Sequence, residues 1–150
     1  MDSRNLKIIP YVSVGKVRFG MTPAEAVAAL GAPNSTSKTH LGGRVDFYEA
    51  INVGYTTSLS PVVNHVGGGR DAKSAEIVEV KLFSGDPEEV LRQLSVKDGN
   101  PKQYLGFVIF LNLGLTLTGF HDDDASQLAF AAFAKGTWDA RLQKLKPFAL

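Results

Sequence analysis

The sequence feature that most constrains the fold is a helix start that occurs twice. Thr22-Pro23-Ala24-Glu25 and Asp86-Pro87-Glu88-Glu89 each place a capping residue before a proline, with a glutamate three positions after the cap. Thr and Asp accept hydrogen bonds from the free N–H groups of a first helical turn, proline fits at the first helical position, and the glutamate can close a capping box. Gly31 is a typical helix stop, and Pro33 follows it. The pattern predicts one helix over Thr22–Leu30 and a second one that begins at Asp86.

Runs of β-branched and aromatic residues after each of these helix starts predict strands. Arg44–Tyr48 and Ile51–Thr57 form one expected hairpin, and Tyr104–Leu111 and Leu115–Phe120 form another across a glycine-containing turn. Glu76–Phe83 has apolar residues at both parities, which favours one central strand. The weak alternation of residues 11–19 fits either a short strand or an extended arm.

The other segments are expected to be loops or further helices. Asn34–Gly43 is polar, and Ser58–Ala75 contains a proline and three consecutive glycines, so both are predicted as loops. A loop as long as the second one is usually functional or mobile. Asp124 is a candidate cap for a third helix that runs through Ala134, and residues 138–145 can add a last short helix.

Two parts of the sequence correspond at an offset of 64. Phe19, Thr22 and Pro23 fall on Phe83, Asp86 and Pro87, and positions in the two expected hairpins also align. A helix-then-hairpin unit used twice explains this, and so does independent convergence on one capping pattern. The sequence predicts a single α+β domain over residues 1–150, with an antiparallel sheet of about five or six strands packed with two to four helices.

The composition excludes several classes of protein. The 16 Lys and Arg residues almost balance the 15 Asp and Glu residues, which provides no general attraction to nucleic acid or anionic membrane. Without cysteine there can be no disulfide, thiol nucleophile or thiolate metal site. No apolar run is long enough for a signal peptide or a membrane span, so we expect a cytoplasmic protein.

No catalytic or cofactor-binding motif is present. The glycines match neither a dinucleotide-binding fingerprint nor a phosphate-binding loop, and His40, His65 and His121 lack the spacing of a zinc site. There is no nucleophile elbow, and a Ser-His-Asp triad is recognised by geometry rather than by sequence order. We therefore expect a protein that is not an enzyme and that needs neither a cofactor nor a metal.

The strongest polar cluster is His121-Asp122-Asp123-Asp124. Three carboxylates can bind calcium or magnesium, although the further ligands of an EF-hand are absent. The same acids also fit a solvated turn at a positive helix end, or a contact with a basic partner. A small metal-dependent hydrolase that uses these residues is therefore an alternative to a binding function.

Partner binding is the use that the sequence favours for its other conspicuous side chains. Tyr is common at interface hot spots, and the first expected hairpin and the glycine-containing loop are candidate surfaces. The predicted partner-binding residues, in the hairpin, the loop and the acidic cluster, are Tyr48, Glu49, Tyr55, Arg70, His121, Asp122, Asp123 and Asp124.

A family resemblance adds a specific expectation. Phe19-Gly20-Met21-Thr22, with Glu25, Val27, Leu30-Gly31 and Pro33, forms an F-G-M-T-x-x-E-x-V-x-x-x-L-G-x-P pattern. This resembles the helix-turn of β-lactamase-inhibitor-protein-like proteins, which include small outer-membrane assembly lipoproteins, and of many small bacterial immunity proteins. Residues 107–120 also look like segments of immunity proteins from polymorphic toxin systems. Together the two segments cover about a third of the chain.

The resemblance implies a function in bacterial competition. The lipoprotein branch is disfavoured because the sequence has no lipidation cysteine. The remaining branch implies an immunity protein that binds a cognate toxin and occludes its active or substrate-binding surface, without direct contact with nucleic acid or membrane. A basic, nucleic-acid-acting toxin would suit the acidic cluster. A general protein-interaction or assembly module is a further alternative.

Overall fold

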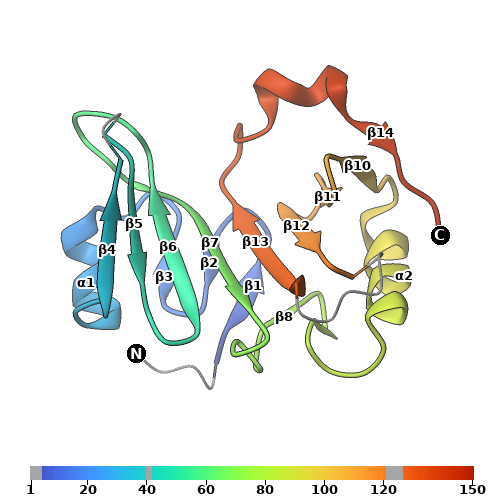
Figure 1. Cartoon of the computed structure of the whole chain (residues 1–150), viewed down its shortest axis with the longest axis horizontal. Coiled ribbons are helices and arrows are strands. Elements are labelled where there is room, and N and C mark those ends of the chain that lie inside the picture. Colours follow the sequence, from blue (N-terminus) through green and yellow to red (C-terminus); the bar gives the residue numbers. More distant parts are fainter. Residues whose placement is uncertain (1–4, 40–41, 121–126) are drawn as a thin grey trace.

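The computed structural model of the chain describes residues 5–39, 42–120 and 127–150, and β-strands are the main regular secondary structure there (Figure 1). The helices are α1 (Pro23–Leu30), α2 (Pro87–Asp98) and the 3-10 helix η2 (Asp139–Lys144). The strands are β1 (Lys7–Ile9), β2 (Ser13–Val14), β3 (Val17–Arg18), β4 (Ser35–Lys38), β5 (Arg44–Phe47), β6 (Ile51–Tyr55), β7 (Val63–Gly69), β8 (Glu76–Ile77), β9 (Val80–Lys81), β10 (Lys102–Tyr104), β11 (Phe107–Phe110), β12 (Leu115–Thr118), β13 (Ala129–Phe133) and β14 (Lys146–Pro147).

The predicted fold class, an α+β domain with about five or six strands, is wrong. Fourteen strands in the described residues form two sheets. The larger sheet has nine strands in the order β14-β10-β11-β12-β13-β7-β6-β5-β4, and the smaller has five in the order β3-β2-β1-β8-β9. The structure has more strands than the sequence predicts, because several strands lie in segments that were expected to be loops or a helix.

The nine-stranded sheet consists of two successive sets of four strands with one added edge strand. Helix α1 precedes β4 to β7, and α2 precedes β10 to β13. The two sets meet where β7 pairs antiparallel with β13. The expected helix-then-hairpin unit is therefore too short, because a full meander of four strands follows each helix. Figure 1 shows α1 and α2 on opposite sides of the molecule, with the strands between them.

The two α-helices begin where the sequence predicts. Thr22 accepts a hydrogen bond from the Glu25 N–H at 3.2 Å, and Glu25 accepts one from the Thr22 N–H at 3.1 Å, so the first capping box is formed. In α2, Asp86 caps the Glu88 N–H at 3.2 Å. The second capping box, which was predicted at Glu89, does not form. The Glu89 carboxylate instead accepts a hydrogen bond from Arg92 at 2.6 Å.

Strand β7 corrects the expectation of a loop over Ser58–Ala75. The three glycines, Gly67, Gly68 and Gly69, lie in the longest strand among the described residues, and this strand is central in the sheet. Close packing explains two of them: a Cβ on Gly68 would lie 2.8 Å from the Ala50 carbonyl oxygen and 3.0 Å from the Phe130 ring, and a Cβ on Gly67 would lie 3.0 Å from the Phe130 carbonyl oxygen. Tripled glycine, which usually indicates flexibility, here allows close approach of neighbouring strands.

Two further segments have a different secondary structure from the one expected. The single strand predicted over Glu76–Phe83 is a tight hairpin, β8 and β9, because the backbone turns at Val78 and Glu79 with φ values of 44° and 68°. The third helix predicted from Asp124 to Ala134 is wrong where the chain is described, because Ala129–Phe133 forms β13. Pairing with β7 and β12 on both sides overrides the local helix preference of this alanine-rich segment.

Smaller corrections concern strand ends. The polar loop expected from Asn34 to Gly43 contains the edge strand β4, and residues 11–19 form the β2–β3 hairpin. The strand expected over Tyr104–Leu111 divides into β10 and β11 at a Leu105-Gly106 turn. The short helix expected over residues 138–145 is confirmed as the 3-10 helix η2.

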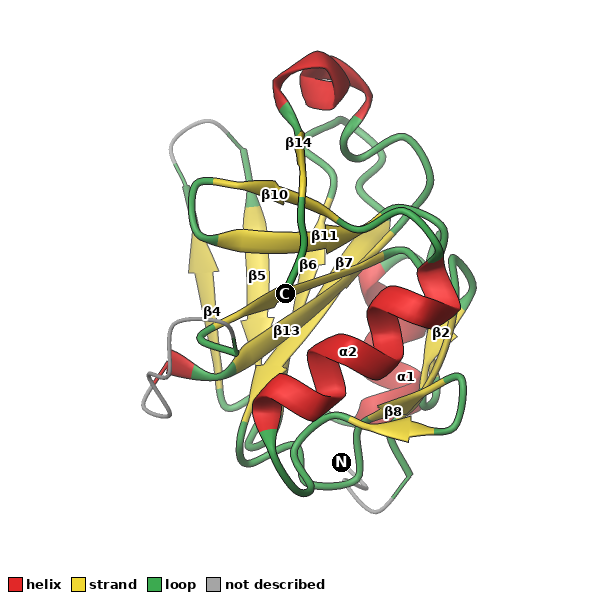
Figure 2. Ribbon diagram, turned by 90° about the vertical axis from the view of Figure 1, so that its right-hand side faces the viewer, coloured by secondary structure: helices red, strands yellow, loops and turns green. Residues whose placement is uncertain are grey.

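The main hydrophobic core lies on one face of the nine-stranded sheet. In Figure 2, α2 crosses in front of this sheet, beside the smaller one. Its fully buried members come from the sheet strands, the smaller sheet and α2, and include Ile8, Val53, Ile77, Leu91, Leu94, Phe110, Leu115 and Leu117. This packing covers one face of the large sheet, and the other face is free of α1 and α2.

Candidate partner-binding surface

The face of the large sheet opposite the helices is the strongest candidate surface, and we call it the open face. Residues paired across antiparallel strands point to the same side, so the register defines the members of this face. One row crosses eight strands through Ser35, Phe47, Asn52, Gly67, Ala131, Thr116, Ile109 and Lys102. A second row places Ser37, Val45, Gly54, His65 and Phe133 side by side.

Trp138 covers one half of the open face. Its ring centroid lies 6.2 Å from that of Tyr104, 6.4 Å from that of Phe107 and 6.4 Å from that of Phe133. These rings belong to β10, β11 and β13, so the segment that leads into η2 lies over this half of the sheet. Ile109 and Phe133 are consequently buried, although they point away from the main core.

The other half of the open face, on β4 to β7 and β13, is accessible. Phe47 is 39% exposed, and Val45, Asn52, His65 and Ala131 are half-buried. Gly54 and Gly67 have no side chains, so the backbone forms a shallow floor between these groups. An accessible apolar surface of this kind, with an exposed aromatic ring and a few amide and imidazole groups, is typical of protein interfaces.

His65 lies across this glycine floor. A Cβ added to Gly54 would overlap the imidazole, so the ring rests directly on the neighbouring strand. Its Nδ1 lies 2.8 Å from the Asn64 side-chain oxygen, and burial lowers the pKa of His65 below its usual value of 6.5. Neutral imidazole is the form that this position favours, which keeps the centre of the open face uncharged.

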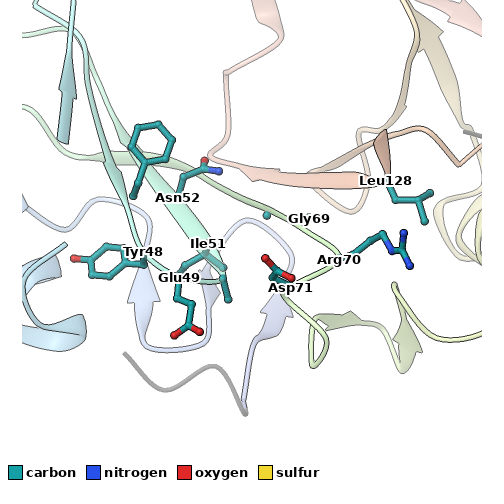
Figure 3. A pocket seen from close by; sticks show the side chains of 11 residues that line it. Tyr48, Glu49, Ile51, Asn52, Gly69, Arg70, Asp71 and Leu128 are labelled. Atoms are coloured by element: carbon teal, nitrogen blue, oxygen red, sulfur yellow. The ribbon is translucent and has the colours of Figure 1, made fainter. Parts of the chain in front are cut away.

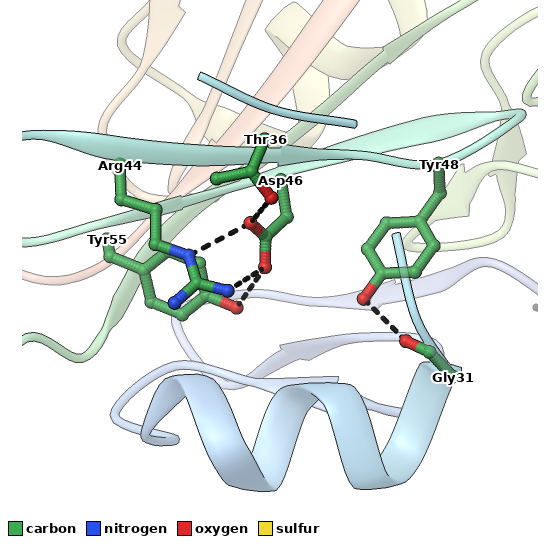
Figure 4. Close-up of polar contacts among 6 residues, drawn as sticks. All are labelled: Gly31, Thr36, Arg44, Asp46, Tyr48 and Tyr55. Carbon is green, nitrogen blue, oxygen red and sulfur yellow. Dashed lines mark hydrogen bonds and ion pairs between the residues drawn. The ribbon is translucent and has the colours of Figure 1, made fainter. Parts of the chain in front are cut away.

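The opposite face of the same strands holds a buried ion pair. Arg44 donates two hydrogen bonds to the fully buried Asp46, at 2.9 and 3.1 Å, and Thr36 donates one at 2.8 Å (Figure 4). Tyr55 donates a further bond to Asp46 at 3.2 Å, while the Arg44 guanidinium lies 5.3 Å from the Tyr55 ring centroid. Burial alone would raise the pKa of Asp46, but the bonds from Arg44 and Thr36 outweigh it and lower that pKa.

Two predicted partner-binding residues are part of the interior. Tyr48 is 8% exposed and donates to the Gly31 carbonyl oxygen at 3.0 Å, and Tyr55 is 4% exposed within the Asp46 cluster. The expectation that these rings face a partner from the hairpin is therefore wrong. Both phenols stabilise the fold through hydrogen bonds: Tyr48 joins the sheet to the end of α1, and Tyr55 binds Asp46.

Glu49 and Arg70 are exposed and line one shallow pocket (Figure 3). The pocket has a volume of about 360 Å³ and lies where the β5–β6 turn meets the end of β7. Phe47 and Asn52, members of the open face, line it as well, together with Asp71. The structure thus brings two residues singled out in the sequence next to the open face.

The remaining predicted residues, His121, Asp122, Asp123 and Asp124, lie outside the described residues. Within the described ranges, no group of three or more His, Cys, Asp or Glu side chains could hold a metal ion. In the same ranges, no helix has the length and apolar character required to cross a membrane.

Sequence reasoning did not find Phe47, Asn52, His65 and Ala131 as neighbours. The alternation in Arg44–Tyr48 indicates that Val45 and Phe47 share a face, and this signal could have identified Phe47. The other three depend on the pairing of β6 with β7 and of β7 with β13, which join residues far apart in the chain.

Comparisons with known proteins provide no family assignment. No family model matches the chain, and neither a curated protein nor a solved structure matches it.

Proposed function

We propose that this protein is an immunity protein that binds a cognate bacterial toxin through the accessible half of the open face and occludes its active or substrate-binding surface. The observation that supports the proposal best is the accessible sheet face itself, in which Phe47 stands exposed beside a glycine floor. A rigid sheet presents side chains in fixed positions, so little conformational entropy is lost when a partner binds. The sequence resemblance to immunity proteins supports the toxin as the partner.

Neutralisation in cells tests the proposal. The protein is co-expressed with the toxin-like reading frame adjacent to its gene, and we expect growth to be rescued and the two proteins to co-purify. Phe47→Glu and Ser37→Glu each place a charge on the open face and should abolish rescue, since an unpaired charge at an interface costs several kcal/mol.

A matched control separates this surface from a general effect. Val96→Glu changes an apolar residue that is 77% exposed on α2, away from the open face, and should leave rescue unchanged. Thermal unfolding of each variant checks that it folds. Absence of rescue and of co-purification with the wild-type protein would refute the proposal, and equal effects of all three variants would refute the assignment to the open face.

A further inference from the structure

We propose that the partner carries an acidic segment with an apolar side chain, and that this segment binds at a corner of the molecule formed by η2, β14 and β10. The inference rests on the proposed function and adds the chemistry of the partner. We call the site the basic corner and define it by Lys102, Arg141, Lys144 and Lys146.

Charge is concentrated at the basic corner. Residues 99–107 and 137–150 contain four Lys and Arg side chains, the members of the corner, and one side-chain carboxylate, that of Asp139. The chain has 16 basic and 15 acidic residues in all, so 12 basic and 14 acidic residues lie elsewhere. Cations therefore gather here in a chain that is nearly neutral as a whole, which produces a local positive potential.

These cations have no acidic partners within the described part of the chain. The ion pairs found there involve Arg44 and Arg92, and none involves a member of the basic corner. Strand pairing fixes the backbone of the corner: Lys146 lies opposite Gln103, Lys102 lies opposite Pro147, and Gln103 donates a hydrogen bond to the Pro147 carbonyl oxygen at 2.8 Å. Lys102 therefore points to the side of the open face, whereas Lys144 and Lys146 line one pocket and remain available to an external anion.

A pocket and exposed aliphatic residues lie among the cations. The pocket has a volume of about 320 Å³ and is lined by Gln103, Tyr104, Leu105, Lys144 and Lys146. Leu105 is 78% exposed, and Leu142, on η2, is 47% exposed. A leucine or phenylalanine side chain flanked by carboxylates matches this combination of an apolar wall and ammonium groups.

The same features favour an acidic protein segment over a nucleic acid. Nucleic-acid sites combine cations with free aromatic faces on which bases stack. Here Trp138 and Tyr104 are half-buried against each other, and the Arg141 guanidinium lies 5.0 Å from the Trp138 ring centroid. Phe107, which is 39% exposed, packs edge-on against Trp138, and the two most exposed apolar residues of the corner, Leu105 and Leu142, are aliphatic, which suits a polypeptide.

The basic corner also adjoins the open face. Trp138, which leads into η2, contacts Phe107 and Phe133 of that face, and Lys102 occupies the end of its long row. A toxin seated on the accessible half of the open face would reach the corner with an acidic segment that crosses the half covered by Trp138. This chemistry differs from the basic partner suggested by His121–Asp124.

A titration with a defined peptide tests the inference without the toxin. ¹⁵N-labelled protein is titrated with a ten-residue peptide of glutamate and leucine, and with a matched peptide of glutamine and leucine. We expect amide shifts confined to residues 102–105 and 141–147 with the acidic peptide, which weaken as salt increases because the charges are exposed. Lys144→Glu/Lys146→Glu should weaken binding about tenfold or more, a change of at least about 1.4 kcal/mol.

Matched controls make each outcome decisive. Lys73→Glu/Lys81→Glu removes two exposed cations outside the corner and should leave binding unchanged. Equal binding of the glutamine peptide, no shifts with either peptide, or binding of a single-stranded oligonucleotide in place of the acidic peptide would overturn the inference. If toxin neutralisation survives Lys144→Glu/Lys146→Glu, the inference fails while the proposed function stands; if the acidic peptide binds but the toxin is not neutralised, only the proposed function fails.

Discussion

The imidazole of His65 rests on the backbone of Gly54, the residue opposite it on the adjacent strand. The two residues are 11 positions apart in sequence, and each accounts for the residue type found at the other position. Glycine leaves the space that the ring fills, and the ring covers a backbone segment that would otherwise be open. This pair is the centre of the accessible half of the open face.

Gly54→Ala should destabilise the protein. The added methyl group would overlap the His65 ring, and overpacking of this kind costs about 1–3 kcal/mol. Urea unfolding measures the change. Gly69→Ala is the matched control on β7, because a Cβ there would meet only the Leu128 carbonyl oxygen, at 3.4 Å, and this variant should differ little from the wild type. An unchanged Gly54→Ala stability would contradict the close packing of this pair.

Stability should depend on pH through His65. Burial lowers the pKa of the folded-state imidazole below 6.5, so the unfolded chain binds the proton more tightly. The contribution of neutral His65 is fully present above pH 6.5 and is lost as the pH falls from 6.5 through the lowered folded-state pKa. Urea unfolding of the wild type and of His65→Gln between pH 5 and pH 8 should converge as the pH falls. Parallel curves over this range would show that His65 is not the responsible group.

Asp46→Asn should be strongly destabilising. The substitution removes the negative charge that faces Arg44, whose side chain is 28% exposed, and weakens hydrogen bonds to a charged group, each worth about 1.5–3 kcal/mol. Thermal or urea unfolding provides the measurement. Glu89→Gln breaks the exposed pair with Arg92 on α2 and should have almost no effect, because solvent screens that pair. Similar losses in the two variants would argue against the special role of the Asp46 cluster.

Glu79→Gly should stabilise the protein slightly. Glu79 is exposed and has a φ of 68°, a backbone conformation that glycine adopts without steric cost. Relief of the left-handed strain exceeds the extra entropy of the unfolded glycine, so a net gain of about 0.5 kcal/mol is expected. The shift in Tm measures this gain, and Glu79→Ala, which keeps the strain, should show none. A loss of stability in Glu79→Gly would indicate that the Glu79 side chain contributes more than its exposure suggests.

Local signals predicted α1, α2 and the first hairpin correctly, but not the third expected helix, whose described part forms β13. The Thr22–Glu25 capping box, the Gly31 stop and the Asp86 cap are interactions within a few residues, and each forms as its residue types require. The β5–β6 hairpin is likewise confirmed. These elements depend on contacts that the sequence places side by side.

The candidate surface was predicted less well, because it depends on contacts between residues that are far apart in the sequence. Tyr48 and Tyr55 were predicted to bind a partner because tyrosine is common at interface hot spots, but both side chains are buried and donate hydrogen bonds to Gly31 and Asp46. Glu49 and Arg70 proved to be exposed and line one pocket. Whether a tyrosine side chain on this hairpin is buried depends on how α1 packs against β5. Residue type alone does not specify this packing.

The sequence by itself therefore determined where the helices begin, how the nearest strands turn back, and which broad chemistries are excluded by the lack of cysteine. Only the tertiary structure decided that the glycine-rich segment is the central strand β7 and that the alanine-rich segment is β13. The physical reason is that a strand is stabilised by its neighbours: Gly67 pairs with Ala131, and Gly54 with His65. The open face and the basic corner exist because these distant pairings assemble residues that the sequence keeps apart.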